Sequence, residues 1–185
     1  MTGVLAVQGD FKEHEEALSS AGEDWFEIRC SKDIEKPFDR LVFPGGESTV
    51  QSRLIRELHL FASLKAAIDS GVPVFATCAG MILLSDRCGG SEGCCFRTLP
   101  VNVRRNAYGR QLGSFFTEDT FSGIGTVPME FIRAPYIESA GEGVEIKSVT
   151  GGHITGVRYK NQLAVSFHPE LTGDVRIYRY WLGAD

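Results

Sequence analysis

The sequence has no block of lysine and arginine residues, and its 185 residues carry a formal net charge of −5. Because nucleic-acid phosphates are bound by clustered positive charge, this composition argues against a nucleic-acid partner. The longest apolar stretch, VPVFATCAGMILL, has about 13 residues, whereas a membrane-spanning helix needs about 20. The first residues, MTGVLAVQGDFKEHEE, have no basic segment before an apolar one. We therefore expect neither a membrane span nor a signal peptide.

Cysteine is present in an odd number, five, without a secretory signal. Reduced thiols and a cytoplasmic location are therefore expected. Cys88, Cys94 and Cys95 lie in the loop-like segment SDRCGGSEGCC, but no histidine is near them and a fourth ligand at zinc-site spacing is lacking. The sequence also has no G-x-G-x-x-G or P-loop pattern. We expect no metal site and no nucleotide-phosphate loop.

Strand-like and helix-like patterns alternate in the first half of the chain. The predicted strands are 4–8, 24–29, 40–43 and 72–77, and the predicted helices are 11–20, 49–70 with a break near His59, and 79–85. This alternation indicates βαβ units and a parallel sheet. A chain of this length is most simply one domain, which we place over residues 1–185.

The second half is rich in short β-type segments separated by glycine and proline. These segments are QLGSFF, PMEFI, VEIKSV, ITGVRY and LAVSF. They predict antiparallel strands that extend the sheet or form a small side sheet. A closing helix over 174–182 would place Val175, Tyr178 and Trp181 on one face. The predicted fold class is α/β, with a central, mostly parallel sheet flanked by helices and antiparallel strands in the second half.

Cys78 lies between the predicted strand 72–77 and the predicted helix 79–85, in the stretch FATCAGMILL. A residue at such a turn is exposed above the sheet, where the N–H groups of the helix favour an anion such as a thiolate. The small residues Ala79 and Gly80 permit a sharp turn of the nucleophile-elbow type. The alternative is that Cys78 is a small buried apolar residue, which is the commoner role of a lone cysteine.

His168 and Glu170 follow the predicted strand LAVSF in the segment SFHPEL. In extended backbone, residues two apart point to the same side, so the carboxylate could hold the imidazole in one tautomer. Pro169 favours this extended conformation at His168. A nucleophilic thiol needs such a base and such an orienting group. The alternative is a polar strand end without a catalytic role.

The segment FPGGEST at 43–49 connects a predicted strand to a predicted helix. Its two glycines allow backbone N–H groups to face a ligand. The N–H groups of Gly46 and Ala79 are candidates for an oxyanion hole. A simple capped turn, with Ser48 or Thr49 as the N-cap, is compatible with that role.

Taken together, these motifs resemble class I, triad-type glutamine amidotransferases, which have a flavodoxin-like three-layer sandwich fold. More narrowly, the chain resembles the PdxT/SNO family of glutaminase subunits of pyridoxal 5′-phosphate synthase. The matching stretches are GVLAVQGDFKEH, FPGGEST, TCAGMILL, RRNAYGRQ, FIRAP and FHPEL. The cysteine and His-Pro-Glu motifs are specific only to the class, whereas GVLAVQG, RNAYGRQ and FIRAP are narrower.

This resemblance implies a role for each matching residue. Cys78 would be the nucleophile, His168 the general base and Glu170 the residue that orients it. Glutamine would be held by residues of three segments, namely Gly46, Glu47, Ser48, Arg105, Ile132 and Arg133. Arginine is a good partner for the α-carboxylate of free glutamine, which makes Arg105 and Arg133 candidates for that contact. Amide hydrolysis of this type needs no cofactor.

The resemblance also implies a partner. In the family, a (β/α)8-barrel synthase subunit receives the ammonia, and twelve copies of each subunit form a large complex. Activity of the isolated subunit would then be low until the synthase docks, with the Gly45–Gly46 peptide as a possible switch. Departures from the family pattern are small: Ala76 replaces a frequent glycine, and Val50 replaces a frequent threonine.

Three alternative functions are compatible with parts of this pattern. One is a glutaminase subunit of another amidotransferase, such as imidazole-glycerol-phosphate synthase, and only the narrower motifs argue against it. A second is a non-catalytic scaffold of the same fold, which would not need the triad and the Pro-Gly-Gly segment together. A third is a stress protein or cysteine hydrolase on a related α/β fold, which the position of His-Pro-Glu after the last strand fits poorly.

Overall fold

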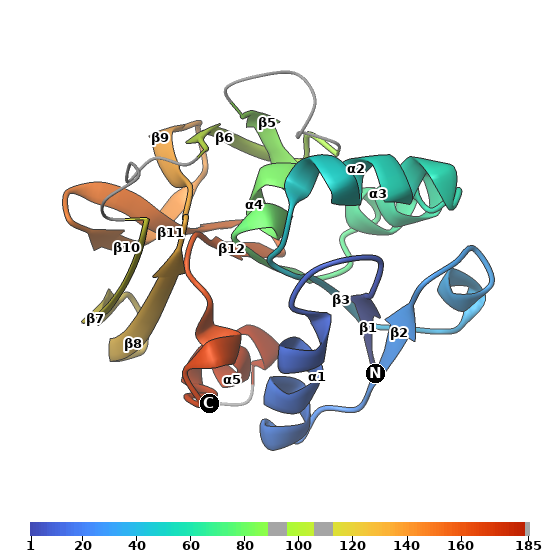
Figure 1. Ribbon diagram of the computed structural model, residues 1–185, viewed down its shortest axis with the longest axis horizontal. Helices are drawn as coiled ribbons and strands as arrows, with labels where there is room; N and C mark the ends of the chain where they lie inside the picture. Colours follow the sequence, from blue (N-terminus) through green and yellow to red (C-terminus); the bar gives the residue numbers. More distant parts are fainter. Residues whose placement is uncertain (89–95, 106–112, 184–185) are drawn as a thin grey trace.

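A mixed β-sheet forms the centre of the molecule (Figure 1). The computed structural model describes residues 1–88, 96–105 and 113–183. Within these residues, ten strands form one sheet in the order β2-β1-β3-β4-β12-β11-β9-β6-β5, with β10 paired to β11. The strands of this sheet are β1 (Thr2–Leu5), β2 (Trp25–Ile28), β3 (Arg40–Phe43), β4 (Val74–Thr77), β5 (Ser85–Arg87), β6 (Leu99–Arg104), β9 (Tyr136–Ala140), β10 (Glu145–Thr150), β11 (His153–Tyr159) and β12 (Gln162–Val165).

The sheet is parallel from β2 to β12, antiparallel from β12 through β11 and β9 to β6, and parallel again where β5 pairs with β6 at the edge. Strand β12 pairs in parallel with β4, and β11 pairs antiparallel with β12. Strands β7 (Ser114–Phe121) and β8 (Gly125–Ile132) form a separate antiparallel hairpin. Both outcomes that the sequence left open for the second half are therefore present, because some strands extend the sheet and two form a side hairpin.

Helices cover the two faces of the parallel part of the sheet (Figure 1). They are α1 (Phe11–Ser20), α2 (Ser48–Glu57), α3 (Phe61–Asp69), α4 (Ala79–Leu84) and α5 (Arg176–Leu182), with 3₁₀ turns at η1 (Asp33–Glu35) and η2 (Pro169–Leu171). Ile55, Leu64 and Met81 from α2, α3 and α4 share one buried cluster, whereas Leu18 and Tyr178 from α1 and α5 belong to another. Two apolar layers on opposite faces of one sheet define the predicted three-layer sandwich.

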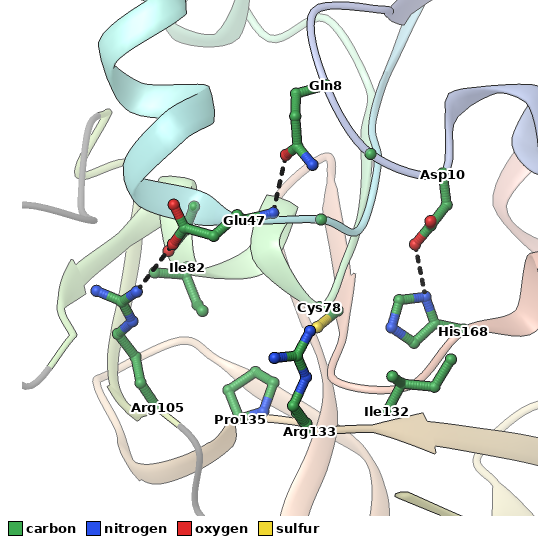
Figure 2. A pocket seen from close by; sticks show the side chains of 13 residues that line it. Gln8, Asp10, Glu47, Cys78, Ile82, Arg105, Ile132, Arg133, Pro135 and His168 are labelled. Atoms are coloured by element: carbon green, nitrogen blue, oxygen red, sulfur yellow. Dashed lines mark hydrogen bonds and ion pairs between the residues drawn. The ribbon is translucent and has the colours of Figure 1, made fainter. Parts of the chain in front are cut away.

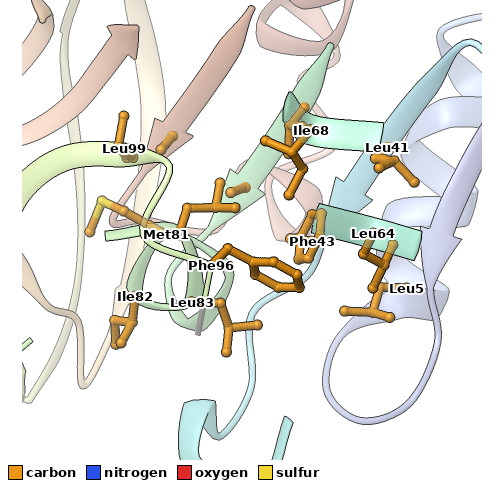
Figure 3. Packing of buried hydrophobic residues seen from close by; sticks show 14 of the residues in the cluster. Leu5, Leu41, Phe43, Leu64, Ile68, Met81, Ile82, Leu83, Phe96 and Leu99 are labelled. Carbon is orange, nitrogen blue, oxygen red and sulfur yellow. The ribbon is translucent and has the colours of Figure 1, made fainter. Parts of the chain in front are cut away.

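The larger cluster lies between the sheet and helices α2 to α4 (Figure 3). Phe96 connects the sheet to the helices that cover it. Its ring centroid lies 5.3 Å from that of Phe43 at the end of β3 and 5.3 Å from that of Phe61 in α3. Phe43 and Phe96 are both buried. Such aromatic pairs add about 0.5–1.5 kcal/mol beyond the burial of their area. This packing fixes the carboxyl end of β3, where the Pro-Gly-Gly segment begins.

The predicted helix break near His59 is confirmed, since α2 ends at Glu57 and α3 begins at Phe61. The prediction for the first strand was wrong at its end: β1 covers Thr2–Leu5 and not residues 4–8. Beyond Leu5 the chain leaves the ladder, and Gln8 instead accepts a hydrogen bond from the N–H of Glu47 at 2.8 Å. The sequence analysis also missed β5, β6 and β9, and part of the segment QLGSFF lies outside the described residues.

In the described part of the chain, no helix is both long enough and apolar enough to cross a membrane. Cys30 and Cys78 are free thiols, but Cys88 is disulfide-bonded. The expectation that all thiols would be reduced is therefore wrong at Cys88. The other two cysteines of that cluster, Cys94 and Cys95, lie outside the described residues.

Candidate active site

Cys78 occupies a sharp turn between β4 and α4. Its backbone has φ 44° and ψ −101°, a conformation that residues other than glycine rarely adopt. The turn is held by the N–H of Cys78, which donates to the carbonyl of Val165 at 2.8 Å, and by the N–H of Ile82, which donates to the carbonyl of Cys78 at 3.3 Å. Such strain costs about 1–3 kcal/mol and persists where the surrounding structure enforces it. The cysteine is thus presented above the carboxyl end of the sheet as an elbow.

Gly80 permits this turn because the end of β3 lies directly against it. A Cβ atom at Gly80 would lie 2.1 Å from the carbonyl oxygen of Phe43. No side-chain rotation can relieve that contact, since the neighbouring atom belongs to the backbone.

Gly80→Ala is therefore expected to lower the free energy of unfolding by about 2 kcal/mol or more, the usual cost of overpacking a well-packed core. Chemical denaturation of both proteins measures this difference. Gly141→Ala, which would place a Cβ 2.9 Å from the Pro100 carbonyl oxygen at the far side of the sheet, is the control for a milder backbone contact. Equal stability of Gly80→Ala and the unmodified chain would contradict the steric account of the elbow.

His168 and Glu170 lie close together after β12, as predicted. The Nδ1 atom of His168 is 2.7 Å from Oε1 of Glu170, and both side chains are buried. The N–H of His168 donates to the carbonyl of Glu130 at 2.8 Å, which anchors the backbone to β8. Glu170 is in the 3₁₀ turn η2 and not in extended backbone, so the pairing arises from a turn that begins at Pro169.

The charge state of this pair follows from its surroundings. Burial lowers the pKa of His168, but hydrogen bonds to Cys78 and Glu170 outweigh it and raise the pKa to about 11. Burial raises the pKa of Glu170, yet the nearby His14 and His168 outweigh it, so this pKa is lowered. At neutral pH the site therefore holds an imidazolium beside a carboxylate. Because α4 has only six residues, the positive charge next to the Cys78 sulfur comes mainly from His168.

A single pocket of about 410 Å³ brings together most of the predicted site residues (Figure 2). The predicted site residues that line it are Gly46, Glu47, Ser48, Cys78, Arg105, Ile132, Arg133 and His168. Ala79 and Glu170 lie behind this lining, as the first residue of α4 and as the buried partner of His168. The predicted residues thus converge, although they come from five separate segments of the chain.

Glu47 and Arg105 interact directly at the edge of the pocket. The Glu47 carboxylate caps α2 by accepting from the N–H groups of Thr49 at 3.1 Å and Val50 at 2.8 Å. Arg105 Nη2 lies 3.2 Å from Glu47 Oε1 (Figure 2). Burial raises the pKa of Glu47, but the two backbone N–H groups and Arg105 lower it overall. Glu47, and not Ser48 or Thr49, is therefore the N-cap of α2.

Arg133 is placed differently. It is exposed, has an unusual φ of 43°, and makes no ion pair with another residue of the described ranges. Figure 2 shows its guanidinium directed toward the region of Cys78. Of the two candidate arginines, Arg133 is the one whose charge is not already matched by a carboxylate.

The Pro-Gly-Gly turn is tied to the loop after β1. The carbonyl of Gly45 accepts from the N–H of Asp10 at 3.2 Å and from Gln51 Nε2 at 3.3 Å. Gly46 has φ +145°, and a Cβ there would lie 2.6 Å from Gln8 Oε1. Because a trans peptide points its C=O and the next N–H in opposite directions, the N–H of Gly46 faces away from Asp10.

The sequence analysis assigned no role to the loop after β1, yet Gln8, Gly9 and Asp10 line the pocket. Asp10 Oδ2 is 3.4 Å from His168 Nδ1. Partial burial raises the pKa of Asp10, while the charge of His168 opposes that rise. The available signal was their position directly after a strand of a parallel sheet, where ligands bind at the carboxyl edge.

Asp10, His168 and Glu170 also place three potential metal-ligand atoms within 4.8 Å of one another. A metal ligand must be a neutral imidazole, so a cation here would have to break the 2.7 Å contact between His168 and Glu170. The Nδ1 atom of His168 is directed at Glu170 in this contact. The geometry therefore suits a charge pair better than a cation site.

The chain is similar to known proteins over almost its whole length. The model of the SNO glutamine amidotransferase family matches residues 4–184. The pyridoxal 5'-phosphate synthase subunit PdxT of Desulfitobacterium hafniense is 57% identical over 180 residues, covering 97% of this chain and 90% of that protein. PdxT of Streptococcus pneumoniae serotype 2 is 45% identical over 183 residues, covering 97% of this chain and 95% of that protein.

The chain is also similar to a solved structure over almost its whole length. A crystal structure described as a glutamine amidotransferase has a TM-score of 0.92 and 40% identity, covering 98% of this chain and 97% of that chain. The fold is therefore that of the glutamine amidotransferases. Within that class, the chain belongs to the SNO glutamine amidotransferase family.

Proposed function

We propose that this chain is the glutaminase subunit of a pyridoxal 5′-phosphate synthase. It hydrolyses L-glutamine to L-glutamate and ammonia and supplies the ammonia to a synthase subunit. The observation that carries the proposal is the meeting of Cys78 and His168 at one pocket, with Glu170 paired to His168 behind it, in a chain 57% identical to a curated PdxT.

In the first half-reaction, Cys78 is the nucleophile. Its sulfur attacks the side-chain carbonyl carbon of glutamine, a carbon–sulfur bond forms, and the carbonyl oxygen becomes an oxyanion. His168 then gives its proton to the amide nitrogen, the carbon–nitrogen bond breaks, and ammonia leaves. A γ-glutamyl thioester remains on Cys78. Protonation of His168 at neutral pH, supported by its hydrogen bond to Glu170, suits this step.

In the second half-reaction, His168 is neutral and acts as the base. It accepts a proton from water, the resulting hydroxide adds to the thioester carbon, and the carbon–sulfur bond breaks to release glutamate and the thiolate. Glu170 keeps the same imidazole edge directed at the substrate and stabilises the cation that reforms. The cycle consumes one water and needs no cofactor.

The oxyanion is stabilised by the N–H groups of Gly46 and Ala79 in this proposal. The N–H of Ala79 is at the start of α4, among the N–H groups that helix geometry leaves without an intrahelical partner. The Gly45–Gly46 peptide serves as the switch that the synthase controls. Its present orientation is held by the Asp10 N–H and the Gln51 side chain, so reorientation would break two hydrogen bonds.

Glutamine binds between the FPGGEST segment and the β8–β9 connection. Arg133 contacts the α-carboxylate, because its charge has no carboxylate partner among the described residues. Arg105 holds Glu47 and the N-terminus of α2 in place. Ser48 offers a hydroxyl that is buried at the pocket and has no hydrogen-bond partner among the described residues. Gly46 and Ile132 complete the wall.

The partner is a (β/α)8-barrel synthase subunit, with twelve copies of each chain in the assembly. The proposed location is the cytoplasm, and residues 1–185 form a single glutaminase domain. One continuous sheet from β2 to β5 and a family match over residues 4–184 support the single domain.

Ammonia release from L-glutamine by the purified chain, alone and with a pyridoxal 5′-phosphate synthase barrel subunit, tests the proposal. The expected result is low activity alone and strong stimulation by the synthase subunit. Activity without stimulation would indicate a glutaminase subunit of another amidotransferase. No ammonia under either condition would contradict the proposal and favour a non-catalytic scaffold.

A further inference from the structure

A row of buried polar side chains in contact with one another lies behind the triad, on the side of the sheet covered by α1 and α5. Its centre is His14 of α1, which is fully buried. The ring contacts Thr77 through Nε2 at 3.0 Å and Tyr178 through Nδ1 at 2.7 Å. Figure 1 shows α1 and α5 next to each other, although these contact residues are 164 positions apart. The reaction described above assigns no role to His14 or Tyr178.

This chain of contacts reaches the triad through Glu170. The Nε2 atom of His14 is 3.5 Å from Oε1 of Glu170, the same oxygen that lies 2.7 Å from His168 Nδ1. One carboxylate oxygen therefore faces two imidazole rings. The second oxygen, Oε2, is buried without a hydrogen-bond partner among the described residues. The orientation of the carboxylate thus depends on what surrounds Oε1.

The hydrogen positions follow from the chemistry of the groups. Burial and the charge of Glu170 raise the pKa of Tyr178 well above its usual value, so the phenol keeps its proton and donates it to His14 Nδ1. Burial lowers the pKa of His14, which keeps this ring neutral. A neutral ring that accepts at Nδ1 carries its own hydrogen on Nε2. That hydrogen faces the Thr77 hydroxyl and the Glu170 carboxylate.

The other tautomer is disfavoured for two reasons. It would direct the lone pair of Nε2 toward a carboxylate oxygen 3.5 Å away, and it would require the Tyr178 hydroxyl to accept. The phenol hydrogen would then be left without its acceptor in a buried position, at a cost of about 1–3 kcal/mol. Tyr178 therefore selects the tautomer of His14.

We propose that His14 is a positioning residue: fixed by Tyr178 as its neutral Nε2–H tautomer, it directs an N–H at Glu170 and keeps that carboxylate turned toward His168. The inference deepens the proposed function, because it rests on His168 and Glu170 acting on Cys78. The second imidazole takes the place that ordered water would fill in a more open site. It partly offsets the cost of burying the Glu170 charge without adding a net charge.

Other charged groups near the pair act on it too. Asp10 faces His168 at 3.4 Å, and Asp10 and Glu13 both act on His14 electrostatically. Cys78 raises the pKa of His168 and lines the same pocket. Because none of these groups contacts Tyr178, removal of the Tyr178 hydroxyl changes the tautomer restraint and leaves them in place.

The test uses Tyr178→Phe, with Tyr180→Phe as the matched control on the same helix. The readout is the rate of Cys78 alkylation by iodoacetamide across the pH range, followed by mass spectrometry of the Cys78 peptide. Cys30, which is also free, serves as an internal reference. We expect alkylation of Cys78 near neutral pH to slow about tenfold in Tyr178→Phe, because one hydrogen bond in a buried network is lost. The dependence of the alkylation rate on pH should shift as well. Tyr180→Phe should leave both unchanged.

A double-mutant cycle separates positioning from a general loss of packing. If His14 acts through Glu170, adding Tyr178→Phe to Glu170→Gln should cause no further slowing. Equal slowing in both backgrounds, or identical profiles for Tyr178→Phe and Tyr180→Phe, would overturn the inference. His14→Gln, which keeps a donor near Nε2, should slow alkylation less than His14→Phe, and the reverse order would also overturn it.

Alkylation needs neither glutamine nor the synthase, so it tests the inference even if the proposed function fails. The assembled complex provides the second readout. There, Tyr178→Phe should lower kcat for glutamine hydrolysis and leave KM unchanged, because His14 does not contact the substrate pocket. A change in KM alone would contradict a positioning role.

Discussion

Cys78→Ala in the assembled complex is expected to lower the rate of glutamine hydrolysis by about 10⁴-fold or more, the usual effect of removing the nucleophile of a catalytic triad. Among the described residues the only other free cysteine, Cys30, does not line the pocket and so cannot take its place. Alanine keeps the Cβ atom at φ 44°, so the elbow itself should persist. Ammonia release under saturating glutamine measures the change.

Two comparisons make that result specific. Cys30→Ala should retain full activity, because its side chain contacts Asp33 outside the pocket. Thermal unfolding of Cys78→Ala should match that of the unmodified chain. A Cys78→Ala protein that kept the original activity would disprove the proposed mechanism.

Glu170→Gln is expected to have the second largest effect, about 10³–10⁴-fold on kcat, comparable to other orienting carboxylates of triads. The substitution keeps the shape of the side chain but replaces an anion with an amide. An amide that presents its NH₂ group to Nδ1 of His168 would favour the wrong tautomer. The measurement is the pH profile of kcat in the assembled complex.

The sign of the pH effect follows from the charge pair. The pKa of His168 is raised to about 11, so its stabilising interactions are complete below the unfolded value of 6.5 and are lost as the pH rises toward 11. Without the carboxylate, this loss should begin at lower pH, and the alkaline limb of the activity profile should move in the same direction. Glu138→Gln, an exposed carboxylate paired with Arg104, is the control. An unchanged alkaline limb in Glu170→Gln would contradict the assigned role.

The alternating half of the fold was predictable because its signals are local. Helical spacing in 49–70 and glycine or proline at strand ends indicated β3, α2, α3 and β4 nearly to the residue. Strands β6 and β9 were missed because their partners are distant in sequence. In β6 the buried positions Leu99, Val101 and Val103 alternate with less buried ones. Pro100 within this run argues against a strand, and the partner β9, which pairs Ser139 with Asn102, lies far along the chain.

The triad was predictable for a different reason. Cys78 and His168 follow strands β4 and β12, which are parallel neighbours, so both side chains emerge at the same edge. Sequence spacing did not reveal the contribution of Asp10 or His14, because their roles depend on contacts with residues more than 60 positions away. It also could not show that Arg105 is already paired with Glu47, whereas Arg133 is not paired among the described residues.

The central claim is that Cys78 attacks glutamine in the pocket formed by these segments. The most direct measurement is labelling by a glutamine analogue that carries an electrophile at the side-chain carbonyl, followed by peptide mass spectrometry. We predict a covalent adduct on Cys78 that L-glutamine suppresses, that the synthase subunit accelerates and that Cys78→Ala abolishes. Labelling of Cys30 in its place, or labelling of Cys78 that glutamine does not suppress, would contradict the account.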